Sequence, residues 1–353
     1  MYILLAILAF GVLIAVHELG HFLAAKACGV KVNEFAIGMG PKLLQKQGKE
    51  TLYTLRALPI GGYTAMEGED EDTGDPRAFT RKSPWQRGLI LCAGAAMNFL
   101  LGFLLVLCLA PYADFAEPVI AGFYQGCPYE GENALQTGDR VYSVDGHRTF
   151  FLGNFNDYMT RSGSDVHDLV VIRDGKRVTL NDFSMPKLAY TRVDTGATVM
   201  SYGLRFAPRE FGFAADLRYS WYETLDLVRT IWRSLGDLVS GAVRVRELSG
   251  VVGVVDYANE VAVEAETRQE ALFDFTFLFA LVAVNLAVMN MLPIPALDGG
   301  RVFFLIVTAL VERITRRKVN PKYEGYIHTA GFVLMLGLVV FIMFNDVIKI
   351  ITK

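Results

Sequence analysis

The stretch GLILCAGAAMNFLLGFLLVLCLA, residues 88–110, runs for 23 residues without a charged side chain. As a helix rising about 1.5 Å per residue it would span about 34 Å, against about 30 Å for the hydrocarbon core of a bilayer. Residues 275–297 form a second uncharged run of equal length, residues 1–27 are apolar apart from a few polar positions, and residues 327–345 form a fourth block. The sequence therefore predicts four transmembrane helices.

The composition also indicates a membrane protein. The length alone would suggest two or three soluble domains. However, 52% of the 353 residues are hydrophobic and the mean hydropathy is +0.33, values that a soluble protein seldom shows. The first apolar block differs from a secretory signal, because no Lys or Arg precedes Lys26 and no cleavage pattern of small residues follows. We expect this helix to be retained.

Basic residues indicate the orientation of the helices. Ten Lys or Arg residues lie from Lys26 to Arg87, and four more cluster at 313–318, although the net charge is only −3. Because loops rich in Lys and Arg stay in the cytoplasm, both segments should be cytoplasmic, with the two termini and residues 111–274 extracytoplasmic. The four cysteines are scattered and make no disulfide framework.

Shorter elements are expected between these spans. Residues 31–66 carry Gly-rich strand patterns, which predict a small cytoplasmic β element associated with the membrane. Residues 216–245 repeat apolar side chains at spacings of three and four, which predicts an amphipathic helix. This helix could lie on the outer leaflet, roof the membrane helices or pack on a neighbouring domain. Residues 302–311 are apolar but too short to span, so we expect a re-entrant or interfacial piece.

A small extracytoplasmic domain is expected over residues 112–190. Alternating strands are bounded by Asp-Gly turns at 145–146 and 174–175, the second at the tip of a predicted hairpin. The segment Leu135-Gln-Thr-Gly-Asp139 resembles the Leu-x-x-Gly-Asp stretch that is characteristic of PDZ domains. The resemblance implies a single PDZ-like α+β domain; an unrelated small β module is the alternative.

The motif His17-Glu-Leu-Gly-His21 lies inside the first apolar block. Residues four apart share a helix face, so both imidazoles can reach one metal ion, with Glu18 beside them as a proton acceptor. As a bare pattern the motif also arises by chance, and these side chains could merely cap a helix end near the interface. An ionisable group in mid-bilayer costs about 2.5–3.5 kcal/mol, however, which favours a functional site.

A catalytic zinc site needs three protein ligands, so a third is expected elsewhere. His147 and His167 fall in the extracytoplasmic domain, on the wrong side of the membrane, whereas His328 opens the fourth helix and could approach. The better candidate is Asp298. It follows two prolines that break the third apolar run, and two glycines after it permit close backbone approach.

Taken together, the motifs resemble those of the site-2 protease family of intramembrane metalloproteases, in its bacterial regulator-of-sigma-E branch. The resemblance covers nearly the whole chain and is carried by HELGHFLAAKACGVKVNEFAIGMGP (17–41), PIGGYTAMEGE (59–69), the PDZ-like segment, LSGVVGV (248–254) and NMLPIPALDGGR (290–301). It implies that His17, His21 and Asp298 hold one catalytic Zn²⁺ and that Glu18 is the catalytic base.

The resemblance also implies residues that handle the substrate. They are the strand edge at Gly61, Gly62 and Tyr63, which could pair with an unwound substrate, together with Asn290 and Asn98. Two positions depart from the family pattern: the second helix reads Gly94-Ala-Ala-Met-Asn98 where relatives have Gly-Pro-x-x-Asn, and Val251 replaces the proline of Ser-Gly-Pro.

The predicted fold class is a polytopic α-helical membrane protein with four transmembrane helices, a small cytoplasmic β element and an extracytoplasmic α+β PDZ-like domain. The predicted divisions are the first helix with HExxH (1–30), the β element (31–86), the second helix (87–111), the PDZ-like domain (112–190), an amphipathic helical segment (191–271), the third helix with the Asp298 motif (272–300), an interfacial segment (301–325) and the fourth helix (326–350).

The expected activity is regulated proteolysis of single-span membrane proteins in the bacterial cytoplasmic membrane, after a prior cut by a site-1 protease. The active site would face the cytoplasmic side, the lipid bilayer would be the surrounding partner, and no nucleic acid is involved. Two alternatives are a catalytically silent PDZ-bearing membrane scaffold and a metal transporter, although the paired repeats typical of transporters are not found.

Overall fold

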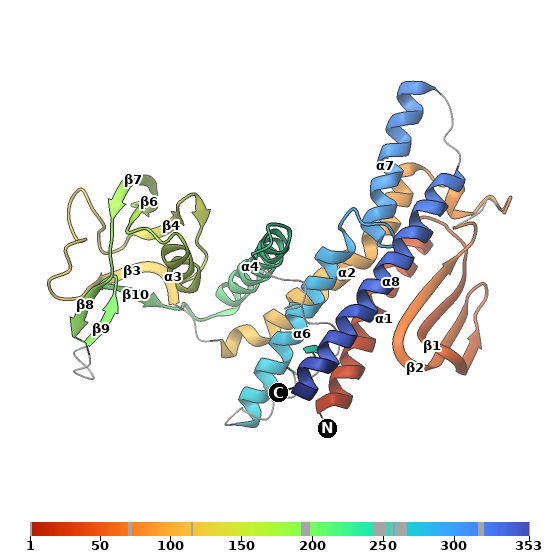
Figure 1. Cartoon of the computed structure of the whole chain (residues 1–353), viewed down its shortest axis with the longest axis horizontal. Helices are drawn as coiled ribbons and strands as arrows, with labels where there is room; N and C mark the ends of the chain where they lie inside the picture. Colours follow the sequence, from red (N-terminus) through yellow and green to blue (C-terminus); the bar gives the residue numbers. More distant parts are fainter. Residues whose placement is uncertain are drawn as a thin grey trace. The chain divides into compact units, whose positions relative to one another are not determined.

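The structure is a computed structural model that describes residues 2–69, 73–113, 116–191, 198–242, 253–254, 257, 267–316 and 321–352. The chain divides into two compact units (Figure 1). The first, which we call the helical unit, comprises residues 1–109 and 224–353; the second, the β domain, comprises residues 110–223.

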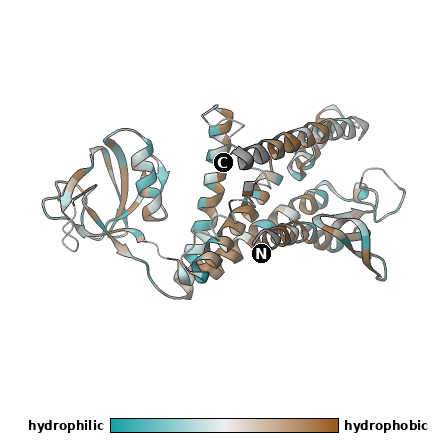
Figure 2. Cartoon of the chain, turned by 60° about the horizontal axis from the view of Figure 1, so that its bottom comes forward, coloured by the Kyte–Doolittle hydropathy of each residue, from teal (hydrophilic) through white to brown (hydrophobic). Residues whose placement is uncertain are grey.

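The helical unit contains four helices that are long and apolar enough to cross a membrane. They are α1 (Tyr2–Ala27), α2 (Pro84–Leu109), α6 (Arg268–Asn290) and α8 (Pro321–Thr352). Hydrophobic residues cover most of the length of these helices (Figure 2). The prediction of four candidate spans is therefore confirmed by length and composition.

Helix α2 packs against both α1 and α6. Gly102 of α2 allows the approach to α6, because a Cβ at that position would lie 2.6 Å from Cγ2 of Val284. Small residues at such crossings let helix backbones come close where lipid gives no hydrophobic driving force between helices. An apolar cluster that includes Leu13 of α1 and Phe279 of α6 completes this packing.

The third apolar run breaks after Asn290, ten residues before the end of the predicted division 272–300. Pro293 and Pro295 have no backbone N–H to continue a helix, and Ala296 has a φ of +80°. A new helix, α7 (Asp298–Thr315), starts directly after this break. The stretch 302–311, expected to be a re-entrant or interfacial piece, is thus part of a continuous helix of 18 residues.

The β element consists of two long antiparallel strands, β1 (Val32–Gln47) and β2 (Leu52–Met66). The register shifts repeatedly along these strands, and residues 34–37 pair with 52–55 on one side and with 62–65 on the other. The hydroxyl of Thr64 donates to the carbonyl oxygen of Glu18 at 3.0 Å. This bond holds the outer edge of β2 along the helix that carries the His residues.

The β domain contains a six-stranded sheet with the order β10-β3-β4-β6-β7 and β5 beside β4, a separate β8–β9 pair and the helix α3 (Leu152–Arg161). The strands are β3 (Ala116–Phe123), β4 (Arg140–Val144), β5 (His147–Arg148), β6 (Val166–Arg173), β7 (Lys176–Ser184), β8 (Leu188–Thr191), β9 (Thr198–Ser201) and β10 (Leu204–Pro208). Both predicted Asp-Gly turns form, with positive φ at Asp145, Gly146, Asp174 and Gly175.

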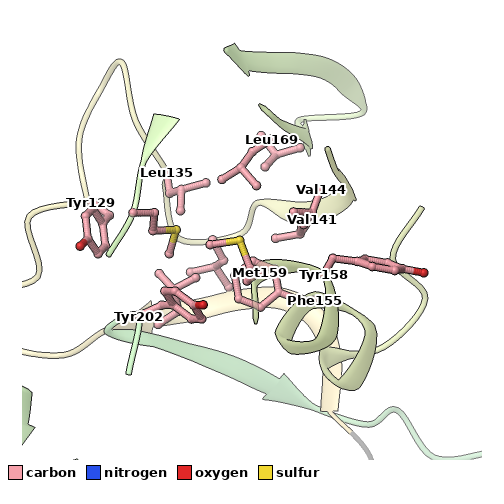
Figure 3. Packing of buried hydrophobic residues seen from close by; sticks show 13 residues of the cluster. Tyr129, Leu135, Val141, Val144, Phe155, Tyr158, Met159, Leu169 and Tyr202 are labelled. Carbon is pink, nitrogen blue, oxygen red and sulfur yellow. The ribbon is translucent and has the colours of Figure 1, made fainter. Parts of the chain in front are cut away.

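The core of the β domain packs α3 onto the sheet (Figure 3). Phe155 and Met159 of α3 are buried against strand residues such as Val141 and Leu169. Beside this core, the carboxylate of Asp139 accepts bonds from Nε and Nη2 of Arg173 at 2.8 and 2.7 Å. This ion pair therefore links the Leu-x-x-Gly-Asp stretch to the hairpin of β6 and β7.

Helix α4 (Phe213–Val239) corresponds to the predicted amphipathic helix. Leu227 and Ile231 are buried, whereas Trp221 and Trp232 are half exposed. Residues 243–250, which include the end of the predicted helix, lie outside the described part of the chain, as does most of the LSGVVGV segment. The three expected placements of this helix remain predictions.

Candidate metal centre and active site

Helix α1 presents His17 and His21 on one face, one turn apart. Both are buried, with 9% and 7% of their surface exposed, and their Nε2 atoms lie 3.1 Å apart. Such a separation between two basic nitrogens, inside a helix that can cross a membrane, indicates that they share a positive partner or a proton.

Asp298, the first residue of α7, completes the cluster. Its Oδ2 lies 3.1 Å from Nε2 of His17 and 3.2 Å from Nε2 of His21. Among the described residues, these are the one group of three His, Cys, Asp or Glu side chains whose ligand atoms lie within 4.8 Å of one another. The break between α6 and α7 therefore brings the carboxylate to the motif on α1.

The geometry of the three atoms fits zinc. Tetrahedral bonds of about 2.0–2.2 Å to nitrogen and oxygen place neighbouring ligand atoms about 3.3–3.6 Å apart. The three separations are only slightly shorter. Two imidazoles and one carboxylate are also a ligand set of catalytic zinc sites, in which the fourth position belongs to water or substrate.

Gly94 of α2 leaves room beside this cluster. A Cβ built at Gly94 would lie 2.8 Å from Nε2 of His17 and would also contact Nε2 of His21. A side chain at this position would occupy the space in front of the ligand atoms. A glycine at this position in the middle of an apolar helix is therefore consistent with a metal site.

Groups on α2 and α6 surround the far side of the imidazoles. Nδ1 of His21 donates to the carbonyl oxygen of Ile90 at 2.9 Å, which leaves the lone pair on Nε2 facing the cluster. Nδ1 of His17 lies 3.4 Å from Nδ2 of Asn98 and 3.4 Å from Nδ2 of Asn290. Both predicted Asn residues therefore meet His17.

Glu18 lies between the cluster and the outer edge of β2. A Cβ built at Gly62 would be 3.3 Å from Cγ of Glu18, so the edge strand runs directly over this side chain. The side chain of Tyr63 contacts Arg56, another residue of β2, with Nη2 of Arg56 2.5 Å from Oη of Tyr63. Gly61 has a φ of +89° and lies against Met39.

The structure brings together most of the residues that the sequence singled out. His17, His21, Asp298, Asn98 and Asn290 meet at one point, with Glu18 and Gly62 adjoining. His147 and His167 belong to the β domain, and the side chain of His328 is outside the described set.

Sequence reasoning missed three contributors, namely Gly94, Thr64 and the carbonyl of Ile90. The available signal for Gly94 was its place in the family motif Gly-Pro-x-x-Asn. The roles of Thr64 and Ile90 depend on hydrogen bonds across 46 and 69 residues, which no local pattern reports.

Comparisons with known proteins identify the family to which the chain belongs. A model of peptidase family M50 matches residues 5–338. A Clostridium acetobutylicum protein named "Putative zinc metalloprotease" is 34% identical, with 98% of this chain and 97% of that protein covered. The "Regulator of sigma-W protease RasP" of Bacillus subtilis is 28% identical, with 97% of each chain covered.

These matches confirm the predicted resemblance to the site-2 protease family, the enzymatic activity and the zinc cofactor. The candidate spans, the buried HExxH motif and the family match are mutually consistent. The chain belongs to peptidase family M50, the site-2 protease family, and is a membrane zinc metalloprotease.

Proposed function

We propose that His17, His21 and Asp298 hold one zinc ion and that Glu18 serves as general base in cutting membrane-spanning proteins. The observation that carries this proposal is the triangle of Nε2, Nε2 and Oδ2 atoms, 3.1–3.2 Å on each side. Two of its corners lie in α1, within the candidate span Leu5–Ala27. A peptide bond must therefore reach the site within or beside the bilayer.

The reaction is hydrolysis of a peptide bond. A bound zinc ion supplies Lewis acidity, which polarises a carbonyl and makes water nucleophilic near neutral pH. Glu18 accepts the proton of the attacking water and passes it to the leaving nitrogen. Glu18 follows His17 in the helix and is partly exposed, so it can reach water that the buried imidazoles cannot.

The outer edge of β2 would hold the substrate. A transmembrane helix hides its own peptide bonds, so the cleaved segment must unwind first. Residues 62–65 pair with β1 on one side only in the described sheet, and Gly62 adjoins Glu18. An unwound segment that adds to this edge by main-chain hydrogen bonds would lie over the base. Asn290, half buried beside His17, would contact the same segment.

Cellular context follows from the same features. The basic segments support an active site that faces the cytoplasm of a bacterial cell, and we infer that the β domain lies outside as a PDZ-like screen for substrates. The sigma-W regulator named among the relatives suggests that single-span regulatory proteins, or leftover signal peptides, are the substrate class. A prior cut by a site-1 protease would admit them.

The test combines two measurements on the detergent-purified chain. We expect one zinc per chain in both the wild type and Glu18→Gln, and cleavage of a model transmembrane peptide by the wild type alone. Zinc without Glu18-dependent cleavage would contradict the proposed role of Glu18. Metal bound and carried across vesicles without any cleavage would instead indicate a transporter.

A further inference from the structure

One face of α2 lines the candidate metal centre at three positions spaced four apart. Ile90 offers its carbonyl oxygen to Nδ1 of His21, Gly94 leaves space before both Nε2 atoms, and Asn98 reaches Nδ1 of His17. Because residues four apart share a helix face, one stripe of α2 serves both imidazoles. Ile90 and Asn98 thus stand in equivalent relation to His21 and His17.

The equivalence is incomplete in one respect. To bind a metal through Nε2, each imidazole must carry its proton on Nδ1 and needs an acceptor there. His21 has one in the carbonyl of Ile90. His17 instead faces the nitrogens of two carboxamides, those of Asn98 and Asn290, each 3.4 Å away. One of these amides should present oxygen when His17 acts as a ligand.

Asn98 is the amide whose surroundings favour that orientation. It is 1% exposed, and its Oδ1 is buried with no hydrogen-bond partner in the described structure. A 180° rotation of the carboxamide exchanges Oδ1 and Nδ2 at nearly unchanged shape. The buried oxygen then accepts from Nδ1–H of His17, which gives a partner to both of these atoms, while the amide nitrogen takes the former place of the oxygen. Asn290 is only half buried and has no such unpaired oxygen.

We propose that Asn98 is a positioning residue for the metal ligand His17 and not a substrate contact. Its carboxamide oxygen fixes the tautomer and the ring plane that direct Nε2 of His17 into the site. Asn290 is thereby left free to bind the substrate. This inference rests on the proposed function, because it assumes that His17 binds the metal.

The experiment measures zinc affinity, by competition with a chromophoric chelator, and the visible absorption of the Co²⁺-substituted chain. Both use the full-length protein in detergent. Asn98→Leu keeps the approximate size of the side chain and removes the acceptor, so affinity should fall about 10–100-fold, as for other second-layer partners of metal ligands. Asn98→Asp keeps an acceptor oxygen and should restore affinity to within a few-fold of wild type, together with a wild-type Co²⁺ spectrum.

Asn290→Leu is the matched control. It removes the other carboxamide at the same distance from His17, and it should bind zinc as tightly as wild type while cleavage falls. Wild-type zinc affinity in Asn98→Leu, or a loss of affinity in Asn290→Leu instead, overturns the proposal. Should the leucine prevent folding, Asn98→Ala gives the same comparison without added bulk.

The outcomes separate this inference from the proposed function. If the wild type binds zinc and cleaves its peptide but Asn98→Leu loses neither property, only the role of Asn98 is wrong. If the wild type itself binds no zinc, the site assignment fails as a whole. A loss that Asn98→Asp does not rescue would show a packing role and would also overturn the proposal.

Discussion

Gly94 and His17 approach so closely that a Cβ on the glycine would lie 2.8 Å from Nε2 of the imidazole. Cβ atoms do not come this near to other heavy atoms without a shift, and here both neighbours sit on packed helices. The space in front of Nε2 therefore exists because residue 94 has no side chain. Helix α2 thus shapes the candidate metal centre, although none of the three proposed ligands lies on it.

Substituting Gly94 should accordingly affect the metal before it affects the fold. We expect Gly94→Ala to lower the zinc content of the purified protein to a small fraction of one per chain. Gly88→Ala, on the same helix as Gly94, is the control. A Cβ at Gly88 would meet only Cδ2 of Leu305, at 3.8 Å. Elemental analysis decides; equal zinc in the two variants would refute the steric argument.

The bond from Thr64 to the carbonyl of Glu18 should matter for the substrate and not for the metal. Thr64→Val keeps the shape of the side chain and removes the hydroxyl, at a net cost of about 1 kcal/mol. If the edge strand holds the substrate, cleavage of a model transmembrane peptide should slow by about fivefold at unchanged zinc content. A parallel loss of zinc would show that the bond supports the metal centre instead.

Much of the fold and of the candidate site could be predicted from sequence, because these features depend on local patterns of residues. Four spans follow from uncharged runs, and the HExxH motif follows from helical spacing. Asp298 was reachable by elimination, since the prolines and glycines around it mark a break with room for a backbone turn. The prolines also predicted the break after α6, although the division 272–300 was drawn ten residues past Asn290, where the helix ends.

Other features depend on contacts between distant residues. Residues 34–37 pair with two separate segments of β2, and the strand patterns over 31–66 do not predict this double pairing. That Ile90, Gly94 and Asn98 line the site cannot be predicted from sequence, because it depends on how α1 packs against α2. The apolar stretch 302–311 continues into polar residues that extend the helix to Thr315.

Glu50 should make stability depend on pH at the junction of α1 and the β element. Hydrogen bonds from Lys26 and Arg77, at 2.5 Å each, lower the pKa of its carboxyl from 4.5 to about 2. Because the folded pKa is the lower one, this contribution is complete above about pH 4.5 and is lost as pH falls towards 2. Between pH 6 and 3 the wild type should therefore lose more thermal stability than Glu50→Gln. Parallel curves in a calorimeter would argue against the coupling.

Asp139 should be a main support of the β domain. Its side chain is fully buried, and it accepts from Arg173 and from the backbone N–H of Gln136. Asp139→Ala leaves Arg173 without its main partner and should destabilise the domain by about 3 kcal/mol. Asp139→Asn, which keeps one acceptor, should cost less. Hydrogen exchange of β4 and β6 in the full chain reports the difference, and equal protection in both variants would count against this role.

The central claim is that His17, His21 and Asp298 hold the zinc ion, and X-ray absorption at the zinc edge tests it most directly. We expect one zinc per chain, nitrogen and oxygen as the only ligand atoms, at about 2.0–2.2 Å, and outer scattering from two imidazoles. In Asp298→Ala the imidazole signal should persist in a reduced zinc fraction with one oxygen ligand lost or replaced by water. A sulfur shell near 2.3 Å, or a spectrum unchanged by Asp298→Ala at full zinc content, would contradict it.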